Sequence, residues 1–273
     1  MILKKNKLNN TQIISVINQK GGVGKTTTVI NLATALSFLN KKILVVDLDP
    51  QGNATTGFGV ANEDNTKTVY DVLNGNCNFE DAIQDTKINN LKIVTSNVDL
   101  SGLEVETANE NRRAFLLKDK IEIFINSSKN DFSYIFIDCP PSLSLLTVMS
   151  VVAAKSLIVP LQAEFFALEG LSQLMKTIDR IKIKLNPSLL IRGVLLTMFD
   201  KRNKLSAEVD TEARKFFNDK VYQTIIPRNV RLSEAPSHGL PVLIYDKSCS
   251  GSKSYLNFAD EFLKQENIME SAA

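Results

Sequence analysis

The chain has 273 residues, of which 44 % are hydrophobic and 23 % are charged, and its formal net charge is +2. This composition is average for a globular protein, so it excludes a disordered chain and allows one large domain or two small ones. The small net charge excludes a surface that is basic all over, and any nucleic-acid contact has to be a local patch.

Residues 1–10, MILKKNKLNN, are polar and basic and have no apolar stretch after the lysines. A secretion signal needs such a stretch, so we expect a short loose arm here. Cys77, Cys139 and Cys249 are far apart and form no CxxC pair. This favours reduced thiols in a cytoplasmic protein over a disulfide framework or a zinc site. No apolar run approaches the ~20 residues that span a bilayer.

Strands and helices alternate along the chain. Nearly continuous apolar runs predict strands at 11–17, 42–49, 134–138, 156–161 and 189–198. Strands of this character are typical of a mainly parallel sheet that is covered on both faces by helices. Apolar residues at helical spacing predict helices over 26–39 and 164–183. We therefore expect an α/β fold, a single domain with three layers, α/β/α.

Residues 57–90 are more polar and contain several Asn and Asp, which predicts an irregular excursion from the same domain. No linker or internal repeat divides the chain. We expect one domain over 11–267 and a loose tail over 268–273.

The segment INQKGGVGKTTTVIN, residues 17–31, joins the first predicted strand to the first helix. Gly24-Lys25-Thr26 fits the end of a phosphate-binding loop, but Gln19 stands where the first glycine of that pattern belongs. The N–H groups of such a turn and the positive end of the helix converge on one anion. Lys25 is placed to reach the β- and γ-phosphates, and the Thr26 hydroxyl to coordinate Mg²⁺. The expected phosphate contacts are Gly21, Gly22, Val23, Gly24, Lys25, Thr26 and Thr27.

Carboxylates follow two of the buried strands. Asp47 and Asp49 end the strand 42–49, and Asp138 ends the strand 134–138. Because Mg²⁺ keeps several of its waters, carboxylates often act on it through the water shell. We expect Asp47 and Asp138 to hold Mg²⁺ in this way, and Asp49 to orient the attacking water. Lys25, Asp49 and Asp138 are thus predicted to be catalytic.

The base is expected to be adenine. GTP-binding enzymes with this loop generally carry an Asn-Lys-x-Asp string that reads guanine. The nearest string, Asn203-Lys204-Leu205-Ser206, has no aspartate. We therefore favour ATP, with Mg²⁺, as the nucleotide.

Four strings in this order, KGGVGKTTT, VVDLDPQGNAT, FIDCPPSL and IPRNVRLSEAPSHG, resemble the ParA/Soj partitioning ATPases. These form one branch of the deviant-Walker class of P-loop NTPases, which also contains MinD. The resemblance covers about residues 11–262. It implies the short form of the family, without an N-terminal helix-turn-helix domain.

The resemblance gives the unexpected lysine of the loop, Lys20, a role. In this class that lysine reaches across a two-fold interface to the phosphates of the partner's ATP, so that ATP controls homodimerisation and Lys20 joins the catalytic set. Similar proteins form the adenine pocket from a loop that follows a late strand. The matching residues here are Met198, Pro227, Arg228 and Asn229.

The resemblance also implies partners. ParA-like dimers bind double-stranded DNA without sequence preference, and Arg202 and Arg231 match the arginines responsible. A ParB-like centromere-binding protein stimulates hydrolysis, which releases the DNA, and the protein associates with the nucleoid. Lys176, Arg180 and Lys184 also share a helix face, which we interpret as solvated surface rather than a DNA track.

Two alternatives within the same loop class stay open. A MinD-like division-site ATPase would end in a basic helix on anionic lipid, but acidic residues surround the apolar side of the predicted last helix, 252–266. We therefore expect no membrane partner. An electron-transfer ATPase like the nitrogenase iron protein needs cysteine ligands for a [4Fe–4S] cluster, and none of the three cysteines has the sequence context of such a ligand.

Overall fold

A computed structural model describes residues 11–61, 63, 65–127, 130–164 and 166–271. The predicted arm, 1–10, lies outside these residues, as do 272–273 at the end of the predicted tail. The last helix, α11, runs over Ser250–Ser271, so most of that tail is helical rather than loose.

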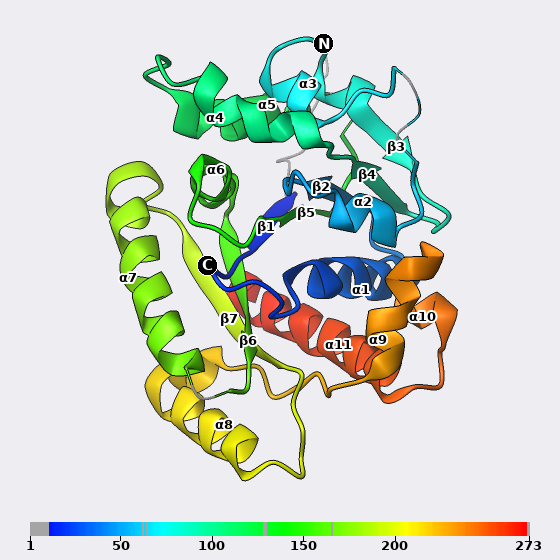
Figure 1. Ribbon diagram of the computed structural model, residues 1–273, viewed down its shortest axis with the longest axis vertical. Helices are drawn as coiled ribbons and strands as arrows, with labels where there is room; N and C mark the ends of the chain where they lie inside the picture. Colours follow the sequence, from blue (N-terminus) through cyan, green and yellow to red (C-terminus); the bar gives the residue numbers. More distant parts are fainter. Residues whose placement is uncertain (1–10, 62, 64, 128–129, 165, 272–273) are drawn as a thin grey trace.

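The described residues form one sheet of seven strands in the order β3-β4-β2-β5-β1-β6-β7 (Figure 1). β3 pairs with β4 antiparallel, and every other pair is parallel. The mainly parallel α/β/α fold that the sequence predicts is thus confirmed. The strands are β1 Gln12–Val16, β2 Ile43–Asp47, β3 Ile83–Asp85, β4 Leu91–Val94, β5 Tyr134–Asp138, β6 Ser156–Gln162 and β7 Leu190–Thr197.

Helices cover both faces of the sheet (Figure 1). α1 (Lys25–Phe38) and α11 pack together on one face. α5 (Leu116–Ile125), α6 (Leu145–Ala153) and α7 (Ala167–Leu185) cover the other, with α8 (Lys204–Phe217) beside α7. The short helices are α2 Asn53–Gly57, α3 Val69–Leu73, α4 Leu103–Glu106, α9 Val230–Glu234 and α10 Val242–Tyr245, and the 3₁₀ turns are Phe79–Ala82, Val98–Gly102, Arg113–Phe115, Asn218–Lys220 and Ala235–His238.

Each central strand contributes to two hydrophobic cores. In β2, Leu44 and Val46 face the core under α5 and α6, whereas Ile43 and Val45 face the core under α1 and α11. Successive side chains of a strand point to opposite faces, so a strand buried on both faces must be apolar at every position. This explains why the central strands read as unbroken apolar runs.

The segment 57–90 was predicted to be irregular, but it contains α3, a 3₁₀ turn and the edge strand β3. Asp71 accepts a hydrogen bond from the Thr68 backbone N–H and begins α3 in this way. The polar composition reflects the position of the segment at the exposed edge of the sheet. Sequence periodicity missed these elements because none exceeds five residues.

Candidate functional site

The glycine loop connects the end of β1 to α1, beside β5 and β6 (Figure 1). Gly22 and Gly24 have φ angles of 76° and 91°, which side chains with a Cβ rarely adopt. Gly24 caps α1 without a side-chain hydrogen bond to the first turn. The N–H groups at the start of α1 therefore remain available to an anion.

Three neighbouring elements hold this loop in place. The Asn18 side chain donates to the backbone oxygen of Pro160 in β6 at 2.8 Å. The Thr197 hydroxyl, at the end of β7, donates to the Val23 oxygen at 2.8 Å, and the Gln19 amide donates to the Gly170 oxygen of α7 at 3.2 Å. The residue that replaces the usual first glycine thus ties the loop to α7. No local sequence pattern indicates these contacts, since each partner lies far along the chain.

The two lysines of the loop have opposite environments. Lys25 is 6 % exposed, and its Nζ donates to the Lys20 backbone oxygen at 3.1 Å. Burial lowers the pKa of Lys25, while the charges of Asp138, Cys139 and Asp49 raise it. The Lys20 side chain is half exposed and forms an ion pair with Glu164, which lies between β6 and α7.

Asp138 is fully buried at the end of β5. Neither carboxylate oxygen accepts a hydrogen bond of ordinary geometry from the described residues. Burial above all, and then the charge of Asp47, raises the pKa of Asp138 well above its usual range, while the nearby Thr26 hydroxyl and Lys25 lower it. A buried carboxylate without partners is costly, so this group is suited to a ligand that brings donors, such as a hydrated cation.

Asp47 and Asp49 differ from Asp138 in their contacts. Asp47 accepts hydrogen bonds from the Thr55 N–H and hydroxyl at 2.8 Å each, and from the Asp49 N–H at 3.2 Å. Burial raises its pKa to about 6, although these hydrogen bonds oppose the shift. Asp49 instead lines the cavity in front of the loop, and its Oδ1 accepts from the Gln51 N–H at 3.0 Å. Thr55, for which the sequence predicted no role, therefore positions Asp47.

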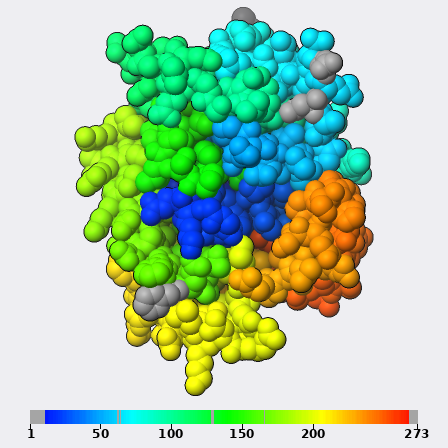
Figure 2. All heavy atoms as spheres, in the orientation of Figure 1, coloured from blue at the N-terminus to red at the C-terminus, as the bar shows by residue number. Residues whose placement is uncertain are grey.

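Two adjoining cavities open along the loop. The first, of about 440 Å³, lies between the loop, Asp49 and the 3₁₀ turn Ala235–His238. The second, of about 250 Å³, continues from it past Gly24 and Thr27. Its lining includes all four residues expected around the base, Met198, Pro227, Arg228 and Asn229. The space-filling view shows the N-terminal loop region (blue) and the segment around 230–250 (orange) bordering one hollow of the surface (Figure 2).

Met198 is unusual in its backbone conformation. Its φ is 50°, and it lines both cavities. A positive φ is strained for a residue with a long side chain. The neighbouring Thr197 hydrogen bond to Val23 holds the strand end against the glycine loop.

The two arginines expected to contact DNA lie on separate elements. Arg202 follows β7, and Arg231 lies in α9. Both side chains are at the surface, and both are paired with carboxylates: Arg202 with Asp200 at 2.8 Å, and Arg231 with Glu234 at 2.7 Å. The structure therefore brings each arginine to the surface, but with an acidic neighbour.

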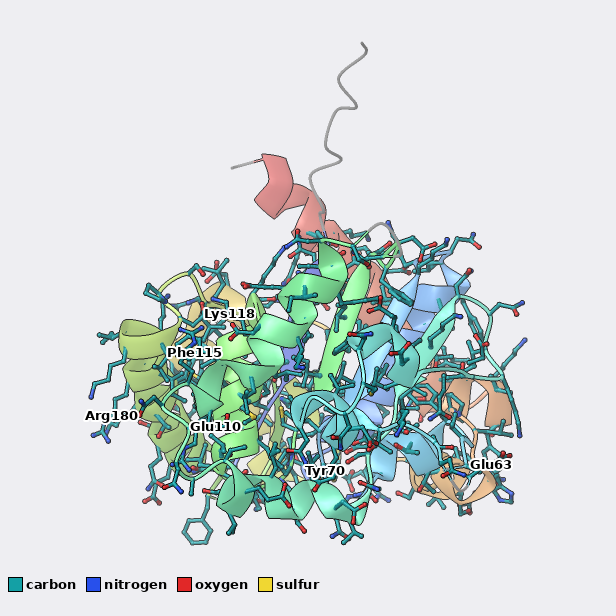
Figure 3. All side chains as sticks on the ribbon, turned by 90° about the horizontal axis from the view of Figure 1, so that it is seen from above. Glu63, Tyr70, Glu110, Phe115, Lys118 and Arg180 are labelled. Atoms are coloured by element: carbon teal, nitrogen blue, oxygen red, sulfur yellow. The ribbon has the colours of Figure 1, made fainter. Side chains whose placement is uncertain are left out.

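Other sequence expectations concern the helices. On the apolar side of α11, Ala259 and Phe262 are fully buried in the core, whereas Leu256 is exposed. Lys176, Arg180 and Lys184 are exposed along α7, and Arg180 points away from the molecule in Figure 3. Among the helices that the structure describes, none is both long and apolar enough to cross a membrane.

The chain is similar in sequence to a known family model and to known proteins. Residues 11–191 match a family model described as an AAA domain. The chain is 48 % identical over 265 residues to the chromosome partitioning protein ParA of Caulobacter vibrioides, covering 97 % of this chain and 98 % of that protein. It is 47 % identical to the sporulation initiation inhibitor protein Soj of Bacillus subtilis, covering 92 % of this chain and 97 % of that protein.

Solved structures agree with these sequence matches. A cobyrinic acid a,c-diamide synthase from Mycobacterium smegmatis, with bound ATP analog and magnesium, has a TM-score of 0.81 at 33 % identity, covering 93 % of this chain and 94 % of that one. A putative plasmid partition protein from Borrelia burgdorferi, bound to AMPPNP, has a TM-score of 0.79 at 27 % identity, covering 93 % and 99 %. The cell division ATPase MinD of Pyrococcus furiosus has a TM-score of 0.76 at 28 % identity, covering 93 % and 98 %.

Proposed function

The chain belongs to the ParA/Soj family of P-loop partitioning ATPases, and we propose that ATP switches it between a free monomer and a DNA-bound homodimer. The observation that carries this proposal is the pair of lysines in one loop. Lys25 is buried beside Asp138, and Lys20 is exposed at the surface. Lys25 is thus placed to serve the protein's own nucleotide, and Lys20 is accessible to a partner subunit.

ATP occupies the two adjoining cavities in this proposal. The backbone N–H groups of residues 21–27 hold the phosphates, and Lys25 neutralises the charge of the β- and γ-phosphates. The adenine lies in the smaller cavity, which Met198 and residues 227–229 line. Support comes from the continuity of the cavities, which share Gly24, Thr27 and Met198.

The Mg²⁺ that relatives bind fits the residues of this chain. Neither oxygen of Asp138 accepts a hydrogen bond of ordinary geometry from the described residues, so both are suited to accept hydrogen bonds from metal-bound waters, and the nearby Thr26 hydroxyl is suited to direct coordination. Bound there, Mg²⁺ supplies charge neutralisation for the leaving phosphate. Asp47 contributes less to the Mg²⁺ site, because its oxygens already accept hydrogen bonds from Thr55 and Asp49. Asp49 orients the attacking water in the larger cavity.

Lys20 completes the site of the partner subunit. In the proposed dimer it leaves Glu164 and contacts the phosphates bound by the partner, so the two protomers associate only when nucleotide supplies the opposite charge. Hydrolysis removes the γ-phosphate, and the dimer opens. The ATPase domain that performs this cycle spans residues 11–267.

Double-stranded DNA binds the dimer through its phosphates, which requires basic contacts but no base readout. Arg202 and Arg231 are the proposed contacts, and both are exposed. A ParB-like centromere-binding partner stimulates hydrolysis and so releases the DNA. The protein then acts as a slow ATPase timer on the nucleoid in the cytoplasm.

DNA binding with ATP, ADP or no nucleotide, at two salt concentrations, tests this function. We expect binding to a non-specific duplex with ATP alone, and weaker binding at higher salt. Arg231→Glu should abolish DNA binding while ATP-dependent dimerisation survives on a sizing column. Equal DNA binding in all three nucleotide states would contradict the switch. Sedimentation with anionic lipid vesicles in ATP, but no DNA binding, would instead support a MinD-like function.

A further inference from the structure

Each proposed DNA-binding arginine is held by carboxylates of the same chain. Arg202 Nε and one terminal nitrogen donate to the two oxygens of Asp200, at 3.0 and 2.8 Å. The Arg202 N–H also donates to Asp200 Oδ1 at 3.0 Å. A two-point pair of this geometry is the strongest form of arginine–carboxylate contact. The Arg202 hydrogen bonds, above all, lower the pKa of Asp200 to about 2, so the carboxylate stays ionised.

Arg231 lies between two carboxylates. Its terminal nitrogen contacts Glu234 at 2.7 Å, and its Nε lies 3.6 Å from Asp246. Both acids are themselves held in place. Glu234 accepts a long hydrogen bond, 3.5 Å, from the Tyr245 hydroxyl, and Asp246 accepts from the Ser248 N–H and hydroxyl at 3.0 and 2.7 Å.

The arginines are more exposed than their acidic partners. The Arg202 side chain is 90 % exposed against 29 % for Asp200, and the Arg231 side chain is 51 % exposed against 39 % for Glu234 and 27 % for Asp246. A phosphate can therefore approach the guanidinium groups, while the carboxylates stay behind them. A bound DNA phosphate would then contact an arginine whose carboxylate partner is still nearby.

We propose that Asp200 and Glu234 are intramolecular competitors of the DNA phosphates and set the affinity of this surface for DNA. This inference rests on the proposed DNA-binding function. An arginine that is already neutralised by a carboxylate adds little net positive charge to the surface and has to give up that contact to bind a phosphate. The carboxylates therefore keep DNA binding weak and readily reversible.

The same carboxylates lie next to residues that line the nucleotide cavities. Asp200 and Arg202 line a groove of about 550 Å³, together with Arg228, which also lines the smaller nucleotide cavity. α9, which carries Arg231 and Glu234, contributes Leu232 and Ser233 to that cavity. A nucleotide that fills the smaller nucleotide cavity would therefore contact the elements that hold both pairs.

Neutral variants of the acids test the proposal. Asp200→Asn and Glu234→Gln keep the shape of each side chain and remove its charge. Binding to a short non-specific duplex is measured by fluorescence anisotropy with a non-hydrolysable ATP analogue, from about 50 to 200 mM salt. Asp119→Asn is the matched control, because Asp119 lies on α5 and pairs with Arg112, so the variant removes an equal negative charge from beside an exposed arginine. Thermal melting of each variant checks that the fold is intact.

We expect each of the two variants to bind DNA about 3–10-fold more tightly at the lowest salt. The slope of log K against log salt should steepen by about 0.9 for each arginine that gains a phosphate. In a double-mutant cycle, Asp200→Asn should add nothing once Arg202 is replaced by alanine. The control should stay within about twofold of wild type.

Three results would overturn the proposal while the DNA-binding function stands. Either wild-type protein binds DNA with the analogue and Asp200→Asn and Glu234→Gln bind equally well, or Asp119→Asn gains as much as they do. A gain from Asp200→Asn that persists in the Arg202→Ala background would also contradict competition for that arginine. Wild-type protein that fails to bind DNA at low salt would overturn the proposed function itself, and the inference with it.

Discussion

The phosphate end of the site and the proposed DNA edge use charged residues in opposite ways. At the phosphate end, Asp138 is fully buried, and neither of its oxygens accepts a hydrogen bond of ordinary geometry from the described residues. At the DNA edge, Arg202 is almost fully exposed and forms a two-point pair with Asp200. The phosphate end buries its charged groups away from solvent, whereas the DNA edge exposes its charged groups to solvent in ion pairs.

The pKa values follow this difference. Burial raises the pKa of Asp138 well above its usual range, whereas the contact with Arg202 lowers that of Asp200 to about 2. A charge is costly where solvent is absent, so a ligand that neutralises it there gains a large free energy. Exposed pairs are screened by water and salt, so each contributes little. The comparison predicts large effects of mutation inside the site and small, salt-dependent effects at the edge.

Lys20→Ala is expected to have the largest effect. Lys20 is exposed in the monomer, so this result would be an exception to the rule that mutations of exposed charges have small effects. A hydrogen bond to a charged group contributes about 1.5–3 kcal/mol, and a two-fold interface contains it twice. The variant should bind ATP about as tightly as wild type but lose about 10²-fold or more in ATP-dependent dimerisation. Analytical ultracentrifugation with an ATP analogue measures this, and a normal dimer would contradict the assigned role.

Asp138→Asn should lower the ATPase rate about 10–100-fold, the usual cost of losing a group that positions a metal's waters. The same change should raise the stability of the nucleotide-free protein by about 1–3 kcal/mol, because it removes a carboxylate whose charged form is disfavoured by burial. Steady-state phosphate release and thermal melting measure the two effects.

The stability gain of Asp138→Asn should depend on pH. The folded-state pKa of Asp138 is raised above its unfolded value, so the protonated group costs nothing below the unfolded pKa. As pH rises through the folded-state pKa, Asp138 ionises inside the protein, and the free energy of unfolding of the wild-type protein falls. The variant should therefore gain more at about pH 8 than at about pH 5. An equal gain at both values would show that Asp138 stays neutral or is already paired.

Glu164→Gln should have a smaller effect in the opposite direction to Lys20→Ala. It frees Lys20 from its ion pair, and a half-exposed pair contributes at most about 1 kcal/mol. Because a two-fold dimer contains this pair twice, we expect ATP-dependent dimerisation to strengthen by at most about 30-fold. Glu169→Gln, an exposed glutamate on α7, is the control. Weaker dimerisation of Glu164→Gln would mean that Glu164 assists the dimer instead of competing with it.

The smallest effect is expected from the basic stripe on α7. A Lys176→Ala, Arg180→Ala double variant should change DNA affinity by no more than about twofold, because the stripe is interpreted as solvated surface (Figure 3). The salt slope of DNA binding should stay the same. A slope reduced by about 1.8 would show that both residues contact phosphates and would extend the DNA surface onto α7.

Much of the fold could be predicted from local patterns. β1, β2, β5, β6 and β7 lie where the apolar runs indicated, and α1 begins at Lys25, close to the predicted start. The segment 57–90 could not be predicted in this way. Its elements are too short to show a period, and α3 and β3 depend on packing against β4 and α5.

The sequence by itself determined the glycine loop, the strands that carry Asp47 and Asp138, and the family. These follow from residue types within short segments, where the backbone conformation is set by neighbours in the chain. Only the tertiary structure decided which groups meet. The pairing of β1 with β5 brings Lys25 to Asp138, the turn after β6 brings Glu164 to Lys20, and the loop after α10 brings Asp246 to Arg231. Such contacts depend on the order of strands in the sheet and on long-range packing, which no local spacing encodes.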